Sequence, residues 1–200
     1  MKSLKIAGTS RTIAERSSEQ ARSLREVREN GGVPCVLYGQ ATEPIHFIAE
    51  HRILEKLVFT PEIFEVKLEI DGKEYLAIMK DLQLHPVKDS ILHIDFYLVD
   101  PAKPIVVAVP VKLEGLAAGV RTGGKLVLQM RKIRVKALIS DIPEKLTIDV
   151  TPLGLGKTMK VGELNFGDKL ELTNAKEAVV CAVQLTRAAR GAAAAAAAGK

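Results

Sequence analysis

A histidine and an aspartate stand two positions apart, at His93 and Asp95, within residues 91–99, a run rich in branched and aromatic side chains. Residues two apart on a strand point to the same face, so a strand here places an imidazole beside a carboxylate. Such a pair can exchange protons as acid and base, or the carboxylate can hold the imidazole in one tautomer. Catalysis would also need a nucleophile or a metal, and no serine stands in a nucleophile-elbow sequence. The pattern therefore favours a binding site over an enzyme.

A second group of hydrogen-bonding side chains lies just upstream and consists of Lys80, Gln83 and His85. Pro86 follows them, and because proline lacks a backbone N–H and has a fixed φ, it separates the residues before it from those after it. We therefore predict two strands joined by a loop. Their polar side chains would be able to bind a backbone or a base edge.

The elements around these residues predict a mainly β fold of the α+β class. Apolar runs and alternation predict strands over residues 3–12, 33–39, 44–50, 64–70, 75–79 and 91–99. The Asp71-Gly72 pair is a strong signal for a tight hairpin turn. Helices are predicted over residues 16–31 and 51–59. We expect residues 1–99 to form an antiparallel sheet or barrel-like domain with one or two helices.

The first predicted helix has a row of arginines at Arg22, Arg25 and Arg28, beside a narrow apolar stripe. Glutamates at positions 19, 26 and 29 can pair with some of them, as on an ordinary solvated helix face. From the helix alone, a polyanion-binding row and a solvated face remain equally good interpretations.

The second half of the chain predicts a separate, all-β domain. Two prolines in residues 100–104 indicate a stiff linker. Short strands are then expected within residues 105–186, over 107–113, 126–138, 146–150, 161–164 and 178–185. This half is the more basic one. The alanine-rich residues 187–200 have no face to pack and are expected to form a disordered tail.

Several other motifs predict no cofactor and no metal. The stretch Gly154–Thr158 ends like a phosphate-binding loop, but the glycine that such a loop requires is replaced by Thr151, so a turn is expected. The four histidines have none of the close spacings of zinc sites. Cys35 and Cys181 stand in apolar runs and are expected to be buried free thiols of a protein in the reducing cytoplasm. No apolar run approaches the roughly 20 residues that span a membrane.

Three stretches, residues 33–39, 80–88 and 93–96, together resemble the large-subunit ribosomal protein twenty-five family, also called the general stress protein CTC family. Residues 109–115, 119–124 and 141–144 resemble its long form, which adds a β-rich second domain. The resemblance covers nearly the whole chain apart from the alanine-rich tail. It implies a structural protein of the large ribosomal subunit that binds 5S ribosomal RNA through its first domain.

The resemblance also implies which residues face the RNA. They are Arg11, Arg16, Arg22, Arg25, Arg28, Tyr38, Lys80, Gln83, His85, His93 and Asp95. The chain departs from the family pattern after Arg11, where Ala14-Glu15-Arg16 replaces an expected Gly-Lys pair, and we expect Arg16 to take the place of that lysine. Arginines position a protein on phosphates, whereas amide, imidazole and carboxylate groups can contact base edges or 2′-hydroxyls.

The expected partners are 5S ribosomal RNA, neighbouring ribosomal RNA and ribosomal proteins of the large subunit, and no membrane. Before assembly we expect a cytoplasmic monomer. The alternative is a stress-linked protein-binding module, or an enzyme, whose working part is the second domain. The sequence does not indicate what the second domain contacts.

Overall fold

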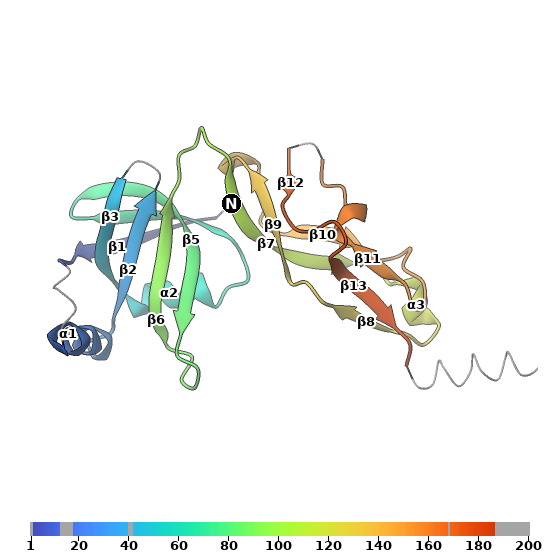
Figure 1. The fold of residues 1–200 in the computed structure, drawn as a ribbon, viewed down its shortest axis with the longest axis horizontal. Coiled ribbons are helices and arrows are strands. Elements are labelled where there is room, and N and C mark those ends of the chain that lie inside the picture. Colours follow the sequence, from blue (N-terminus) through green and yellow to red (C-terminus); the bar gives the residue numbers. More distant parts are fainter. Residues whose placement is uncertain (1, 13–17, 40–41, 168, 187–200) are drawn as a thin grey trace, which may run out of the picture. The chain divides into compact units, whose positions relative to one another are not determined.

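The computed structural model describes residues 2–12, 18–39, 42–167 and 169–186. The chain divides into two compact units, residues 1–103 and 104–200 (Figure 1). The division falls inside the segment that the sequence predicts as a linker. Arg16 and the alanine-rich residues 187–200 lie outside the described residues, so the predictions for them stay predictions.

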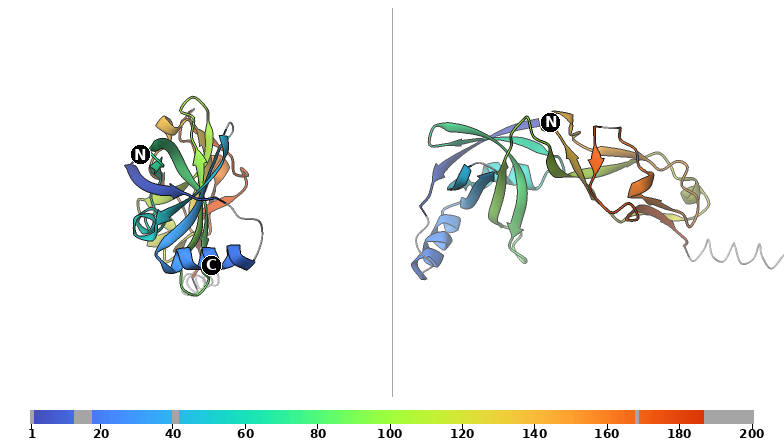
Figure 2. Two further views of the ribbon diagram at one scale, coloured as in Figure 1. Left: turned by 90° about the vertical axis from the view of Figure 1, so that its left-hand side faces the viewer. Right: turned by 45° about the horizontal axis from the view of Figure 1, so that its top comes forward.

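The first unit is a closed barrel with the strand order β1-β3-β2-β6-β5-β4. Its strands are β1 (Lys2–Ser10), β2 (Gly32–Gly39), β3 (Thr42–Glu50), β4 (Phe64–Ile70), β5 (Lys73–Leu84) and β6 (Ile91–Leu98). Its helices are α1 (Ser18–Glu29) and α2 (His51–Val58). Helix α1 lies outside the barrel, at the end where the loop between β5 and β6 also lies (Figures 1 and 2). The barrel-like domain with two helices is therefore confirmed.

Two strand pairs in this barrel are parallel, namely β1 with β4 and β2 with β6. The remaining neighbours are antiparallel, including the β4–β5 hairpin that turns at Asp71 and Gly72, both with positive φ. Parallel neighbours join segments distant in sequence and leave no hairpin signal, which is why alternation alone does not reveal them. The pairing of β2 with β6 matters most, because it brings the two halves of the candidate site together.

The barrel core is formed by the inward-facing residues of the strands together with one face of α2. The rings of Phe47 and Phe96 are fully buried, and their centroids lie 5.8 Å apart. Helix α2 adds Leu54 and Leu57, both fully buried. Each such side chain stabilises the fold by roughly 1.5–3 kcal/mol through burial. The core thereby fixes which residues of each strand face outward.

The second unit contains two small sheets, with the orders β10-β7-β9-β12 and β11-β13-β8. Its strands are β7 (Ile105–Glu114), β8 (Lys125–Leu128), β9 (Lys132–Ala137), β10 (Leu146–Asp149), β11 (Thr158–Lys160), β12 (Glu171–Leu172) and β13 (Val179–Gln184). One turn of helix, α3 (Ala118–Arg121), and two 3-10 turns, at residues 139–141 and 161–163, interrupt the strands. The mainly β second half is confirmed.

Two details of the second unit differ from the sequence predictions. The strand expected at residues 161–164 is a 3-10 turn, which the Glu163 carboxylate stabilises by accepting the Lys160 N–H at 3.2 Å. The single strand expected at residues 126–138 is two strands, β8 and β9, in different sheets. The turn expected near Gly154 is present, since the Lys157 N–H donates to the Gly154 carbonyl at 3.2 Å.

Candidate RNA interface

Four adjacent barrel strands, β3, β2, β6 and β5, present one continuous outer surface (Figure 1). The register pairs Val36 with both His46 and Asp95, and pairs Asp95 with Asp81. Side chains of paired residues point to the same side of a sheet, so these four form a row across the strands. Neighbouring residues such as Cys35 point inward and are buried. The row therefore lies on the outside of the barrel.

Further polar and aromatic side chains extend this row. Gln83 is paired with His93, and Tyr38 is paired with Tyr97. We call the whole surface the polar face, and its side chains are Val36, Tyr38, His46, Lys80, Asp81, Gln83, His93, Asp95 and Tyr97. It brings together five of the residues that the resemblance implies, namely Tyr38, Lys80, Gln83, His93 and Asp95.

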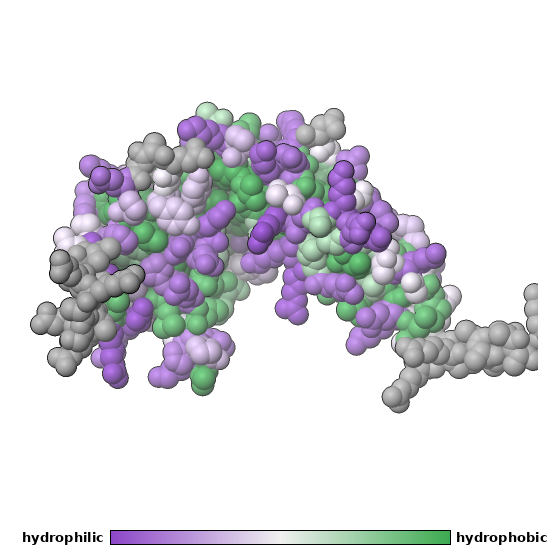
Figure 3. Space-filling view, in the orientation of Figure 1, coloured by the Kyte–Doolittle hydropathy of each residue, from purple (hydrophilic) through white to green (hydrophobic). Residues whose placement is uncertain are grey.

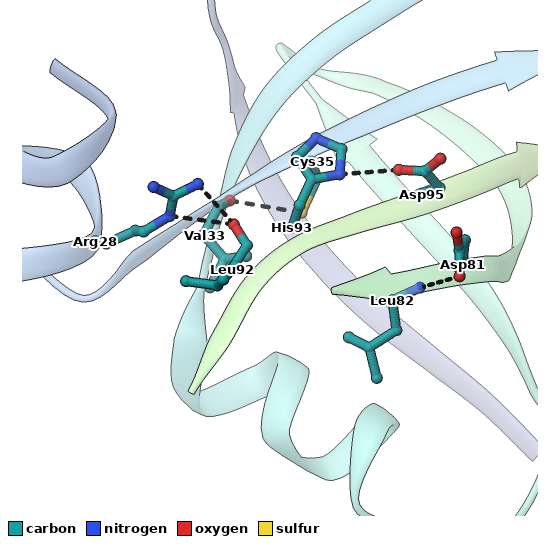
Figure 4. A network of polar contacts seen from close by, with 8 residues as sticks. All are labelled: Arg28, Val33, Cys35, Asp81, Leu82, Leu92, His93 and Asp95. Atoms are coloured by element: carbon teal, nitrogen blue, oxygen red, sulfur yellow. Dashed lines mark hydrogen bonds and ion pairs between the residues drawn. The ribbon is translucent and has the colours of Figure 1, made fainter. Parts of the chain in front are cut away.

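The centre of the polar face is the His93–Asp95 pair on β6. The Nδ1 atom of His93 lies 2.9 Å from Oδ1 of Asp95, and both side chains are about one-third exposed, at 29% and 30% (Figure 4). The carboxylate accepts from Nδ1, which fixes the ring and leaves Nε2 for another partner. The predicted placement of an imidazole beside a carboxylate is confirmed. Its exposure suits contact with a ligand.

An aromatic and cationic group adjoins this pair. The Tyr38 and Tyr97 rings meet edge to face, with centroids 5.9 Å apart, and Lys80 Nζ lies 5.9 Å from the Tyr97 centroid. Lys80 stands at a bulge of β5, where the register shifts between Met79 and Asp81. Burial, together with the nearby carboxylates, raises the pKa of Tyr38. The Tyr38 phenol therefore stays protonated and can donate a hydrogen bond.

The arginines of helix α1 have different surroundings. Nε and Nη2 of Arg28 both donate to the Leu92 carbonyl of β6, at 3.2 and 3.1 Å (Figure 4). Arg28 thus fastens the helix to the strand that contains His93. Arg25 forms a 3.0 Å pair with Glu29 on the solvent side, as the solvated-face interpretation expects. Arg22 belongs to α1, but its side chain is outside the described part of the chain.

Arg11 lies at the edge of the polar face, beside His46. Its backbone N–H donates to the His46 carbonyl at 2.7 Å. Burial lowers the pKa of His46, and the positive charges of Arg11 and His93 lower it further. His46 is a candidate that the sequence analysis missed. The alternation of residues 44–50 places it outward, but only the register shows that Val36 separates it from Asp95.

His85 has a structural role in the loop between β5 and β6. Its Nδ1 accepts the backbone N–H groups of Val87 and Lys88, each at 3.2 Å. Because Nδ1 accepts two hydrogen bonds, the ring proton is on Nε2. Of the two ring nitrogens, Nε2 is therefore the one that can donate to a ligand. Val87 next to it is 84% exposed, and the space-filling view shows an apolar spot at the tip of this loop (Figure 3).

The other candidates for chemistry are possible metal ligands and the two cysteines. The described residues contain no group of metal-ligating side chains and no helix long and apolar enough to cross a membrane. Cys35, the thiol beneath the face, is buried as expected, and burial raises its pKa to about 12. Such a thiol is not a nucleophile at neutral pH. Cys181 is also buried and free.

A barrel with this outer surface suits a protein that binds RNA, because cations of the kind that contact phosphates flank groups that can contact bases. Comparison with known proteins gives the family. Residues 12–96 match the Ribosomal L25p family, and residues 104–187 match the family described as Ribosomal protein TL5, C-terminal domain. The chain belongs to the Ribosomal L25p family, as the resemblance implied.

Curated relatives match over nearly their whole length and are named "Large ribosomal subunit protein bL25". The relative from Bacteroides thetaiotaomicron is 69% identical over 196 residues, which are 98% of this chain and 99% of the relative. Those from Phocaeicola vulgatus and Porphyromonas gingivalis are 60% and 53% identical, with coverage of at least 96% of each chain. None of these names is that of an enzyme, so the enzyme alternative has no support.

Proposed function

We propose that this protein is a structural constituent of the large ribosomal subunit and that its polar face binds 5S ribosomal RNA. The relatives support the first part, since they are named as proteins of that subunit. The protein is then located on the ribosome, in the cytoplasm. The observation that carries the second part is the hydrogen-bonded His93–Asp95 pair, exposed at the centre of the face.

Different residues in and beside the polar face would contact the phosphates and the bases of the RNA. Arg11 and Lys80 supply positive charge at its margins, where phosphates can approach. Gln83 and His93 stand opposite each other on β5 and β6 and can contact base edges or 2′-hydroxyls. A phosphate would be repelled by Asp95. The carboxylate therefore suits a donor such as a base amino group.

Substitution of Asp95 by alanine tests this function in the full-length chain. We expect Asp95→Ala to lower the affinity for 5S RNA by roughly tenfold, since one good base contact contributes about 1–3 kcal/mol. Affinity for a scrambled RNA of the same length should hardly change, because phosphate contacts remain. Filter binding at fixed salt measures both affinities.

The matched control is Glu69→Ala, which removes an exposed carboxylate from β4, outside the polar face. It should leave both affinities as they are. An equal loss on cognate and scrambled RNA in the Asp95→Ala protein would contradict base reading by Asp95. No binding of 5S RNA by the unsubstituted protein would overturn the proposed function.

A further inference from the structure

The second unit has a basic sheet face that 5S RNA binding by the barrel does not explain. In β9 the residues alternate between exposed and buried, and the exposed ones are Lys132, Arg134 and Lys136. Their neighbours Ile133 and Val135 are fully buried in the core of the unit. All three cations therefore stand on the same outer side of the sheet.

The neighbouring strand β7 presents short side chains beside these cations. The register pairs Val106 with Lys136, Ala108 with Arg134, and Pro110 with Lys132. We call these six residues the β7–β9 face. The β7 side chains are shorter than the cationic ones opposite them, so the charged ends can project above the sheet. Successive cations on β9 are about 7 Å apart, since each strand residue advances about 3.4 Å.

The charge of this face is only partly neutralised. Lys136 pairs with Glu171 of β12 at 3.2 Å. Outside the face, at the far end of β7, Lys112 pairs with Glu114 at 2.9 Å. Within the described residues, the side chains of Lys132 and Arg134 have no acidic partner. Among the described residues of their unit, these two neighbouring cations therefore lack an acidic partner.

We propose that the β7–β9 face binds the phosphate backbone of an RNA segment, separately from the polar face of the barrel. Evenly spaced cations suit a partner whose negative charges repeat at a regular interval, as phosphates do along a strand. The face includes no aromatic residue that could stack on bases. It should therefore bind by charge and without sequence preference. An acidic protein surface is the competing partner, but it has no such regular spacing.

The double variant Lys132→Gln/Arg134→Gln of the full-length chain tests this proposal. The probe is ribosomal RNA of the large subunit freed of 5S RNA, bound on filters over a range of salt concentrations. Loss of two phosphate contacts should weaken binding roughly tenfold near physiological salt. It should also reduce the slope of log affinity against log salt by about 1.5. Affinity for 5S RNA should be nearly unchanged, because the barrel provides most of it, and this separates the result from that of the barrel.

The matched control is Lys125→Gln/Lys157→Gln, which removes two exposed lysines from the same unit, one of them on β8 of the other sheet. Circular dichroism should show that both variants remain folded. Equal affinity of variant and control for the large ribosomal RNA would overturn the proposal. So would an equal loss of 5S RNA binding in the variant. If the double variant binds the RNA normally but attaches more weakly to assembled subunits, the face contacts an acidic protein. That result would also overturn the proposal.

Discussion

His46 is a residue whose surroundings predict a dependence of stability on pH. Burial, Arg11 and His93 lower its pKa in the folded protein below the ordinary value of 6.5. As the pH falls through 6.5, the imidazole of His46 therefore binds a proton more readily in the unfolded chain than in the folded chain. The free energy of unfolding should consequently fall as the pH drops from 7 to 5. His46→Gln should make this dependence shallower in urea unfolding.

The control for this measurement is His51→Gln, because His51 lies at the start of α2 and its neighbour at 3.4 Å is Glu55. Its substitution should not remove the contribution of His46. A His46→Gln protein with the same pH dependence as the unsubstituted protein would contradict the lowered pKa of His46.

The buried thiol of Cys35 predicts a loss of stability as pH rises in the alkaline range, whereas His46 predicts a loss as pH falls. Burial raises the pKa of its thiol from 9.0 to about 12, so the unfolded chain loses this proton first as pH rises. The stabilising contribution is complete below pH 9.0 and is lost progressively as pH rises toward about 12. Between about pH 8 and 10.5 the protein should lose about 2 kcal/mol more than a Cys35→Ala protein, at 1.36 kcal/mol per pH unit. Urea unfolding at both pH values measures the difference, and equal losses would exclude it.

Helix α1 is an element that one arginine side chain hydrogen-bonds to the barrel. Arg28 donates twice to the Leu92 carbonyl, so Arg28→Ala should destabilise the docking of α1 by about 1 kcal/mol and expose its amides to hydrogen exchange. Binding of 5S RNA should weaken because the helix no longer has a fixed position. Arg25→Ala removes the same charge from a surface pair with Glu29 and should leave helix protection unchanged.

Hydrogen exchange and RNA affinity, measured in the Arg28→Ala and Arg25→Ala proteins, show whether Arg28 positions the helix or contacts the RNA directly. If Arg28→Ala weakens RNA binding without loosening α1, Arg28 contacts the RNA itself. If both substitutions loosen the helix equally, the hydrogen bonds to Leu92 do not hold it.

The elements also show how far the sequence predicts the site. The adjacency of His93 and Asp95 follows from the two-residue period of a strand, which is a local property. The row from His46 through Val36 to Asp81 depends on the parallel pairing of β2 with β6, which no local pattern encodes. The role of His85 depends on two backbone donors of its own loop. Local periodicity therefore predicts the strands and their outward residues, but long-range register decides which of them meet.

At the scale of the whole molecule, each unit has a core of its own. The barrel core includes inward residues of all six strands of the first unit and of α2, and the second unit buries its own set from β7, β9 and β13. The chain divides between Lys103 and Pro104, close to the ends of the two family matches at residues 96 and 104. Because a compact unit with its own core can fold alone, the two units should unfold separately.

A fragment of residues 1–103 should therefore fold by itself and bind 5S RNA within about threefold of the full-length chain, since the polar face lies entirely on β2, β3, β5 and β6. A fragment of residues 104–200 should fold but bind 5S RNA only weakly, by charge, with a steep salt dependence. Circular dichroism and filter binding measure both properties. If the first fragment folds but loses 5S RNA, the second unit contributes to the same site. If it retains the RNA, recognition belongs to the barrel, and the second unit is free to contact something else.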